Sequence, residues 1–507
     1  MAASAAAVAA ATRSGINLWI ALISSSRPAI LPAVRCKGQA TVLRVVDSLA
    51  VPAPDLMPME EMLARLDRVL AASPAEETEI AWIEVRRSHE EAGRRRSSGE
   101  RRERLLFVRV RESGRIGFQR TGEATVSEIE NAVRTALAQA RLAPAPTANT
   151  PVSFPASPAA PEGRRPTDRG PELLDLELAH LEPPRARTLA ERLAGREGSA
   201  RLSWAAGRMA VARSDGRQLS AEATAAAFTV RDGQGADAGS AAAAARSLSG
   251  LAPEAIAERA RRRRAPAGSL ADLPEGPLPL VLSPEATAAL VDLLNREALS
   301  SLSWREGISV LCDARGQRVF HPTLSLVDDA TEPSGLPFPF DFRGNPKARV
   351  GLVEEGVLRT PAIDLPLSRQ LDAPPTPHAV AFEESLATNL FLLAGASAEG
   401  ELLEQAGEGA LWVGSLEDLA CFAPLRLGFR GVARGVRSIT GGALGRALPD
   451  LVWEADLTAA LSGVLAVGRE TVVVASGEPF LGGISAPALV LSPSGRLTPA
   501  SDRATAR

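Results

Sequence analysis

Apolar residues recur at helical spacing in several stretches of the first half of the chain. Within residues 60–70 the apolar positions share one stripe, which predicts an amphipathic helix. Thr125 and Glu128 have the spacing of a capping box and precede an apolar helical face, so a second helix is predicted to begin there. The same periodicity predicts helices near residues 186–194 and 253–264.

Alternating or continuous apolar runs predict strands. In the first half they cover residues 79–85, 105–110, 200–213 and 217–231. Between the last two, Asp215-Gly216 can adopt the positive φ that a tight hairpin requires. The second half changes to short β segments separated by Gly, Pro and Asp, at 278–282, around 319, and at 324–327, 349–353, 390–393, 410–413 and 488–491. Two helices are predicted among them, at 284–299 and 454–466.

These patterns predict an α+β fold with two domains, an N-terminal mixed α/β domain and a β-rich C-terminal domain. We divide the chain into an N-terminal extension that is disordered or mis-started (1–56), an N-terminal α+β domain (57–145), a Pro-rich linker or loop (146–172), the middle part of the N-terminal lobe (173–275), the β-rich C-terminal domain (276–495) and a tail (496–507).

The N-terminal extension, residues 1–56, has a composition unlike the rest of the chain. Its apolar run at 16–23 is far shorter than the ~20 residues that span a bilayer, so we expect no membrane partner. A signal or transit peptide is compatible with this run, but an upstream mis-assigned start, with Met57 or Met59 as the true one, is favoured. We therefore expect the extension to be dispensable.

Charge argues against a nucleic-acid partner. The chain has 57 basic and 60 acidic residues and a formal net charge of −3, so no global positive field attracts phosphates. The arginine-rich segment 94–104 carries no aromatic residue and is interrupted by Glu100 and Glu103, which favours a solvated hairpin tip over a phosphate-binding surface. The run Arg261–Arg264 ends a predicted helix, where cations complement the helix dipole.

Cysteine and histidine usage gives no sign of a metal or a cofactor. The three cysteines, Cys36, Cys312 and Cys421, are widely spaced, which excludes a disulfide scaffold and favours a reducing, cytoplasmic location. The histidines are scattered and no two have the i, i+4 spacing of a zinc-binding helix; they are His89, His180, His321 and His378. A Ser/His/Asp triad assembled from distant residues remains open.

Several other residues have a structural interpretation that outweighs a functional one. Asp328 and Asp329 are adjacent, so on a strand they point to opposite faces and cannot form an acid/base pair. His321 is a lone histidine, and Cys312 and Cys421 have apolar neighbours typical of buried thiols. The glycine-rich segment 440–445 lacks the spacing and the Lys of a phosphate loop.

A series of short motifs runs in a consistent order from about Met59 to Leu491. They are Gly114–Phe118, Ala138–Pro144, Ala245–Leu248, Leu280–Pro284, Leu324–Asp329, Phe340-Asp341 with Gly344, Leu352–Leu358, Asn389–Leu392, Gly407–Val413, Leu465–Gly468 and Gly482–Pro487. In this order the chain resembles the TldD/PmbA family. The catalytic branch of that family consists of zinc metallopeptidases that act on peptides and unfolded proteins, so the resemblance implies a two-domain TldD/PmbA-like fold.

Two departures place the chain nearer the PmbA/TldE branch. The helix that carries His-Glu-x-x-x-His in the zinc-bearing branch reads Val-Asp-Leu-Leu-Asn-Arg-Glu-Ala at residues 291–298, without a histidine. The Cys-Gly ligand segment of that branch is replaced by Gly482–Pro487, a form typical of the PmbA/TldE branch. A catalytic zinc needs three protein ligands, so we assign no metal ligand, no catalytic residue and no cofactor to this chain.

The resemblance implies a zinc-free partner subunit that pairs with a zinc-bearing TldD-like sister, in a complex that degrades or processes peptides and unfolded proteins. A homodimer remains open, as does an independently active hydrolase that uses a nucleophile such as Ser485 or Cys421. Leu481, Gly482, Gly483 and Ser485 are the candidates for contact with the partner or a peptide, because they form an apolar, charge-free segment. Packing inside the chain's own β domain explains that segment equally well.

Overall fold

The computed structural model describes residues 56–144, 173–266, 270–381, 384–476 and 482–500 of the 507-residue chain. The expected linker at 146–172 and all of the expected extension except Leu56 lie outside these residues. Leu481 also lies outside them.

A six-stranded antiparallel sheet forms the N-terminal domain, in the order β3-β2-β1-β4-β5-β6. The strands are β1 Glu77–Gly93, β2 Ser97–Glu112, β3 Arg115–Thr121, β4 Ser199–Arg213, β5 Gln218–Asp232 and β6 Gly239–Ala245. The strands predicted at 79–85 and 105–110 are the apolar centres of the longer strands β1 and β2. The predicted hairpin joins β4 to β5, and Gly216 has the positive φ of 88° that it requires.

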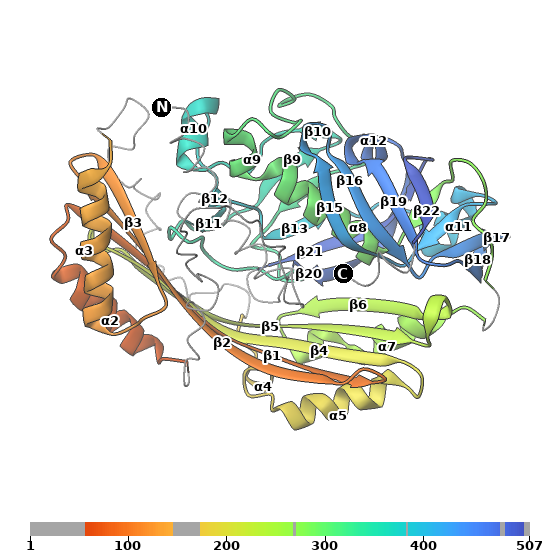
Figure 1. The fold of residues 1–507 in the computed structure, drawn as a ribbon, viewed down its shortest axis with the longest axis horizontal. Helices are drawn as coiled ribbons and strands as arrows, with labels where there is room; N and C mark the ends of the chain where they lie inside the picture. The colour runs from red at the N-terminus through yellow and green to blue at the C-terminus, as the bar shows by residue number, and fades with distance from the viewer. Residues whose placement is uncertain (1–55, 145–172, 267–269, 382–383, 477–481, 501–507) are drawn as a thin grey trace, which may run out of the picture.

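Helices cover one face of this sheet in two groups (Figure 1). One group packs over Trp82 and consists of α2 Met59–Ala71 and α3 Val126–Leu142, where the predicted capping box of Thr125 and Glu128 is present. The other packs over Trp204 and consists of α4 Leu176–Ala179, α5 Pro183–Ala194, α6 Leu248–Leu251 and α7 Pro253–Arg262. The opposite face of the sheet packs against the C-terminal domain.

The arginine-rich segment forms the turn between β1 and β2 and the start of β2. Arg94, Arg95 and Arg96 lie in the exposed turn, as the sequence predicts. Arg102 forms an ion pair with Glu100 at 2.9 Å, and Arg101 pairs with Glu103. These glutamates neutralise part of the segment, which agrees with a solvated tip.

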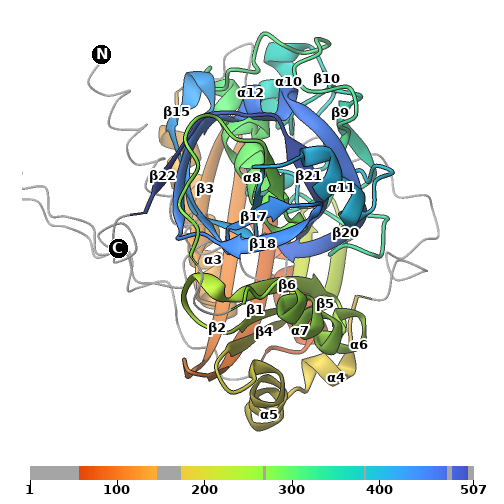
Figure 2. The ribbon, with the colours of Figure 1, turned by 90° about the vertical axis from the view of Figure 1, so that its right-hand side faces the viewer.

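The C-terminal domain contains two larger sheets with the helix α8 Pro284–Leu294 packed between them (Figure 2). The ten-stranded sheet comprises β7 Leu280–Leu282, β8 Leu326–Asp328, β9 Val350–Glu354, β10 Val357–Leu358, β13 Asn389–Leu392, β14 Leu411–Val413, β17 Arg437–Thr440, β18 Ala443–Ala447, β20 Val464–Ala475 and β21 Gly483–Leu491. The four-stranded sheet comprises β15 Ser415–Ala423, β16 Gly428–Arg434, β19 Leu451–Asp456 and β22 Arg496–Pro499. The smaller elements are α9 Ser301–Arg305, α10 Leu365–Leu371, α11 Glu399–Ala406, α12 Leu457–Ser462, β11 Ala379–Ala381 and β12 Glu384–Ser385.

The structure corrects the predicted helix at 454–466. Only α12, six residues long, is helical there, and it lies between the strands β19 and β20. Asp456 caps α12 by accepting a hydrogen bond from the backbone of Ala459 at 2.9 Å, and Gly463 ends it. The apolar residues of β19 and of the start of β20 fit a helical repeat by coincidence, while their burial comes from sheet packing.

Two smaller expectations also change. The strand predicted around residue 319 is reduced to a single bridge between Arg318 and Val357. The segment expected to be a tail begins with β22, which pairs with β19 and completes the four-stranded sheet. β22 is only four residues long and follows a Pro-Ser-Gly turn. Its alternation of apolar and polar residues is too brief to distinguish a strand from a loop in the sequence.

The two domains meet across the free face of the N-terminal sheet. Phe338, Phe340 and Phe342 of the C-terminal domain are buried against that face, and Phe342 packs edge-on to Phe107 at 5.7 Å between ring centroids. Beside them, Arg246 donates hydrogen bonds to the carbonyl oxygens of Leu336, at 2.9 Å, and of Pro337. Burial lowers the pKa of Arg246 to about 9.

A buried ion pair connects α7 to the first turn of α8. Arg263 places one guanidinium nitrogen 3.0 Å from each carboxylate oxygen of Glu285, and Arg259 lies 3.3 Å from the same carboxylate. The guanidinium of Arg263 also lies over the ring of Trp412 at 5.4 Å. Burial alone would raise the pKa of Glu285, but Arg263 and Arg259 outweigh burial and lower it. The N-terminal position in α8 adds to the stability of this negative charge.

Arg263→Ala should lower the free energy of unfolding by about 3–5 kcal/mol, because it removes one of the two cations that hold the buried Glu285. The measurement is urea unfolding of the full chain. The neighbouring Arg262 is exposed, so Arg262→Ala is the matched control and should change stability by no more than about 0.5 kcal/mol. Equal stability of the two variants would contradict this account of the domain contact.

Candidate functional site

The helix in which the sequence resemblance places the family's zinc motif is α8. It follows β7 directly, and the side chain of Ser283 caps it by accepting a hydrogen bond from the backbone of Ala286 at 3.1 Å. Nearly all of its residues are buried, which is typical of a helix in the centre of a domain. The helix ends in a π-helical turn, Asn295–Leu299. Such turns are frequent at functional sites, so this end of α8 is a candidate site.

Four side chains form a polar cluster at this end of α8. We call Asp292, Arg296, Glu297 and Ser476 the α8 cluster. Arg296 Nε lies 2.9 Å from Asp292 Oδ2, and the Ser476 hydroxyl donates to Asp292 Oδ1 at 2.8 Å. Glu297 Oε1 lies 3.9 Å from a terminal nitrogen of Arg296. Burial raises the pKa of Glu297, and the charge of Arg296 opposes that rise.

A second buried network surrounds Asp328 at the end of β8. One carboxylate oxygen accepts hydrogen bonds from the backbone N–H groups of Thr388, at 2.9 Å, and Asn389. The other lies 3.0 Å from His378 Nε2 and 3.9 Å from Lys347 Nζ. Burial would raise the pKa of Asp328, but Lys347, His378 and the Asn389 N–H outweigh burial and hold that pKa far below its usual range.

His378 connects this carboxylate to a hydroxyl group. Its Nδ1 lies 2.8 Å from Thr376 Oγ1 while its Nε2 faces Asp328. Because Asp328 is an anionic acceptor, we assign the proton to Nε2, so Nδ1 accepts from Thr376. Asp328 and His378 are fully buried, so they hold residues 376–379 against β8 and do not reach a substrate.

The two networks meet at residues 387–389. Asn295, the first residue of the π turn, donates a hydrogen bond from Nδ2 to the carbonyl oxygen of Ala387 at 2.9 Å. Thr388 accepts a backbone hydrogen bond from Gly483 at 2.8 Å. The end of α8, the start of β21 and the Asp328 network are therefore fixed to one short segment.

The adjacent aspartates have separate partners, as expected. Asp329 forms an ion pair with Arg349 at 2.8 Å and accepts a hydrogen bond from the Thr331 hydroxyl at 2.6 Å. Asp328 binds a different set of groups on the other side of the backbone. The two carboxylates therefore serve two structural contacts.

The described candidates for partner or peptide contact are buried. Gly483 and Ser485 lie in β21, in the middle of the ten-stranded sheet, and Ser485 is 5% exposed. A Cβ atom on Gly482 would lie 1.8 Å from the carbonyl oxygen of Thr388, so only glycine fits there. These positions favour internal packing for Gly482, Gly483 and Ser485, whereas Leu481 lies outside the described residues.

The residues considered as nucleophiles are poorly placed for that role. Burial raises the pKa of the Cys421 thiol and Glu297 raises it further, so the reactive thiolate is disfavoured. Burial likewise raises the pKa of Cys312. His321 contacts Thr323 at 2.9 Å, and His378 faces Asp328 and Thr376.

The side chains around α8 do not fit a catalytic zinc. In the parts of the chain that the structure describes, no group of three or more His, Cys, Asp or Glu side chains could hold a metal ion. The i, i+1 and i+5 positions of the family's zinc motif hold Val291, which is buried and apolar, and the charged residues Asp292 and Arg296. Arg296 lies in the π-helical turn that follows α8. A guanidinium 2.9 Å from the one carboxylate would repel a divalent cation.

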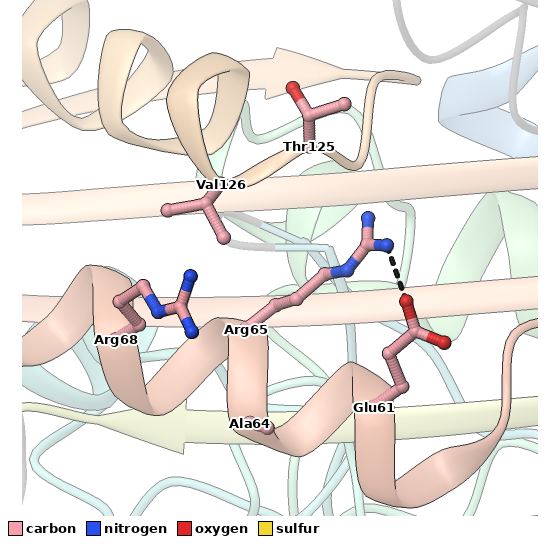
Figure 3. A pocket seen from close by; sticks show the side chains of 6 residues that line it. All are labelled: Glu61, Ala64, Arg65, Arg68, Thr125 and Val126. Carbon is pink, nitrogen blue, oxygen red and sulfur yellow. Dashed lines mark hydrogen bonds and ion pairs between the residues drawn. The ribbon is translucent and has the colours of Figure 1, made fainter.

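A surface hollow of about 390 Å³ lies elsewhere, between α2 and the start of α3 (Figure 3). Arg65 extends across it, pairs with Glu61 and donates to the carbonyl oxygen of Ala124 at 2.6 Å. The N–H groups at the start of α3 are already occupied by the capping box of Thr125. We therefore interpret this hollow as part of the packing contact between α2 and α3.

Comparison with known proteins gives a family match for the C-terminal domain. Residues 275–494 match the family model described as the PmbA/TldA metallopeptidase C-terminal domain. The C-terminal domain of this chain is thus similar to that of the PmbA/TldA metallopeptidases. Comparison with curated protein sequences gives no match. No helix within the described ranges is long and apolar enough to cross a lipid bilayer.

Solved structures extend the likeness in fold to both domains. TldE from Thermococcus kodakarensis is 18% identical, with a TM-score of 0.71 over 86% of this chain and 100% of that chain. A candidate DNA gyrase modulator from Thermotoga maritima is 17% identical, with a TM-score of 0.67 over 87% of this chain and 100% of that one. A similar protein from Bacteroides thetaiotaomicron is 14% identical, with a TM-score of 0.68 over 87% and 99%. The predicted TldD/PmbA-like fold is confirmed.

Asp328→Asn should lower the free energy of unfolding at pH 7 by about 3–5 kcal/mol, because it leaves the buried Lys347 without an anion. The pKa of Asp328 is lower in the folded than in the unfolded state, so the carboxylate stabilises the fold above the unfolded pKa of about 4. That contribution is lost as the pH falls further toward the folded-state pKa. The difference between wild type and variant should therefore shrink below about pH 4.

Urea unfolding at a series of pH values measures this difference. Asp313→Asn, at an exposed carboxylate, is the control and should stay close to wild type throughout. A deficit of Asp328→Asn that is the same at pH 3 and at pH 7 would refute the electrostatic explanation.

Proposed function

We propose that this protein is a zinc-free partner subunit, of the PmbA/TldE type, in a TldD-type metallopeptidase complex that degrades or processes peptides and unfolded proteins. The sister chain supplies the zinc and the activated water, and this chain supplies the companion surface. A homodimer of this chain is the alternative assembly. We propose a cytoplasmic location on the basis of the cysteine usage.

The observation that carries the proposal is the Asp292–Arg296 ion pair on α8. The helix, its cap and its place between the two sheets are kept, while the positions of the metal motif hold an apolar residue and two charges that neutralise each other. A chain that keeps the scaffold without a donor set is suited to pairing with a related chain. Similarity to the TldE structure over that whole chain supports the same role.

The alternative of an independent hydrolase has no specific support among the described residues. It requires a nucleophile activated by a neighbouring base, and the partial burial of Cys421 and the burial of Ser485 work against that requirement. The Asp328–His378–Thr376 contacts have the order of a catalytic relay, but their first two members are inaccessible.

Co-purification with the sister chain tests the proposed function. The tagged full chain, co-expressed with a TldD-like sister encoded beside it, should retain the sister and cleave denatured casein only as the pair. A sister with both motif histidines replaced by alanine should still be retained but should not cleave. Chelator-resistant cleavage by this chain alone would favour the hydrolase instead.

The same assay examines the candidate segment through Leu481→Asp. Loss of the sister with an unchanged circular dichroism spectrum places Leu481 in the interface. Unfolding of the isolated variant assigns Leu481 to the core. Leu393→Asp, at a described position that is 38% exposed, is the control for the added charge.

A further inference from the structure

The metallopeptidase description of the matched family raises the question of what stabilises the end of α8 in this chain. We infer that the guanidinium of Arg296 is an internal cation that does the structural work of a metal ion: it holds two carboxylates at the end of α8 and ties the helix to the end of β20.

The geometry supports a shared cation. Arg296 lies 2.9 Å from Asp292 and 3.9 Å from Glu297, so one positive charge faces two negative ones. Asp292 uses its second oxygen to accept the hydrogen bond of Ser476, which directly follows β20. The contact chain from Glu297 through Arg296 and Asp292 to Ser476 therefore joins a helix to a strand distant in sequence.

This arrangement differs from an ordinary ion pair on a helix surface. The side chains of Arg296 and Asp292 are only 19% and 25% exposed, so solvent screens their attraction weakly. Glu130 and Arg134 on α3 have the same i, i+4 spacing, but their side chains are 33% and 59% exposed. Exposed pairs of that kind contribute little to stability.

A guanidinium differs from a metal ion in two measurable ways. It is covalently attached and always protonated, so a chelator cannot remove it. It also occupies the space between the carboxylates, so a divalent cation has to compete with it. If Arg296 loses its charge, Asp292 and Glu297 become two uncompensated carboxylates next to a hydroxyl group, which is a set of oxygen donors that suits Ca²⁺.

The test is the melting temperature of the full chain with EDTA or with excess calcium chloride. The melting temperature of the wild type should respond to neither. Arg296→Gln should melt roughly 3 °C or more below wild type and should regain part of that loss with calcium. Arg296→Lys, which keeps the charge, should stay closer to wild type than Arg296→Gln does.

Two controls locate the effect. Arg134→Gln should neither lower the melting temperature nor respond to calcium, and Asp292→Asn combined with Arg296→Gln should abolish the response to calcium. An unchanged melting temperature of Arg296→Gln overturns the inference. So does a destabilised Arg296→Gln that neither calcium nor lysine rescues, because the guanidinium would then act through its shape. If Arg296→Gln fails to fold, a folded Arg296→Lys supports the charge and an unfolded one refutes it.

None of these measurements involves a sister chain, so their outcome is independent of the proposed partner role.

Discussion

The placement of α8 depends on a buried carboxylate held from the other domain. Glu285 stands in the first turn of α8, and Arg263 and Arg259 of the N-terminal domain reach it. A buried charge of this kind is costly unless its partners remain in place, so the two domains cannot separate without exposing Glu285 to water or leaving it unpaired. The aromatic contact of Arg263 with Trp412 adds a third element to the same joint. The same ion pairs therefore hold the two domains together and fix the position of α8.

The other end of α8 is fixed by polar contacts of a different kind. Asn295 binds the carbonyl oxygen of Ala387, and the residues that follow supply the N–H groups that hold the Asp328 carboxylate. The same segment approaches Gly482 so closely that a side chain there would overlap its backbone. The end of α8 is therefore fixed by hydrogen bonds of this chain's own side chains and backbone.

Local signals were sufficient for much of the fold. The capping box at Thr125 and the hairpin at Asp215-Gly216 each depend on residues within one turn, and both are present in the structure. The helix predicted at 454–466 failed because an apolar run that spans two strands and a short helix has no unique period. The order of the motifs implied a TldD/PmbA-like fold, which local periodicity alone does not identify.

The polar contacts around the candidate site were mostly beyond the reach of the sequence. His378 and Asp328 are 50 positions apart, and Arg263 was explained by the helix dipole alone because its partner Glu285 follows a long connection. The Asp292–Arg296 pair was the exception, since its i, i+4 spacing is visible in the sequence. The link from this pair to β20 runs through Ser476, which is distant in sequence and reaches Asp292 only in the folded chain.

The zinc content of the purified full chain tests the central claim most directly. Elemental analysis of the chain alone should find far less than one zinc per chain, and in the purified pair the zinc should accompany the sister. About one tightly held zinc per chain, retained by this protein on its own, would contradict the account.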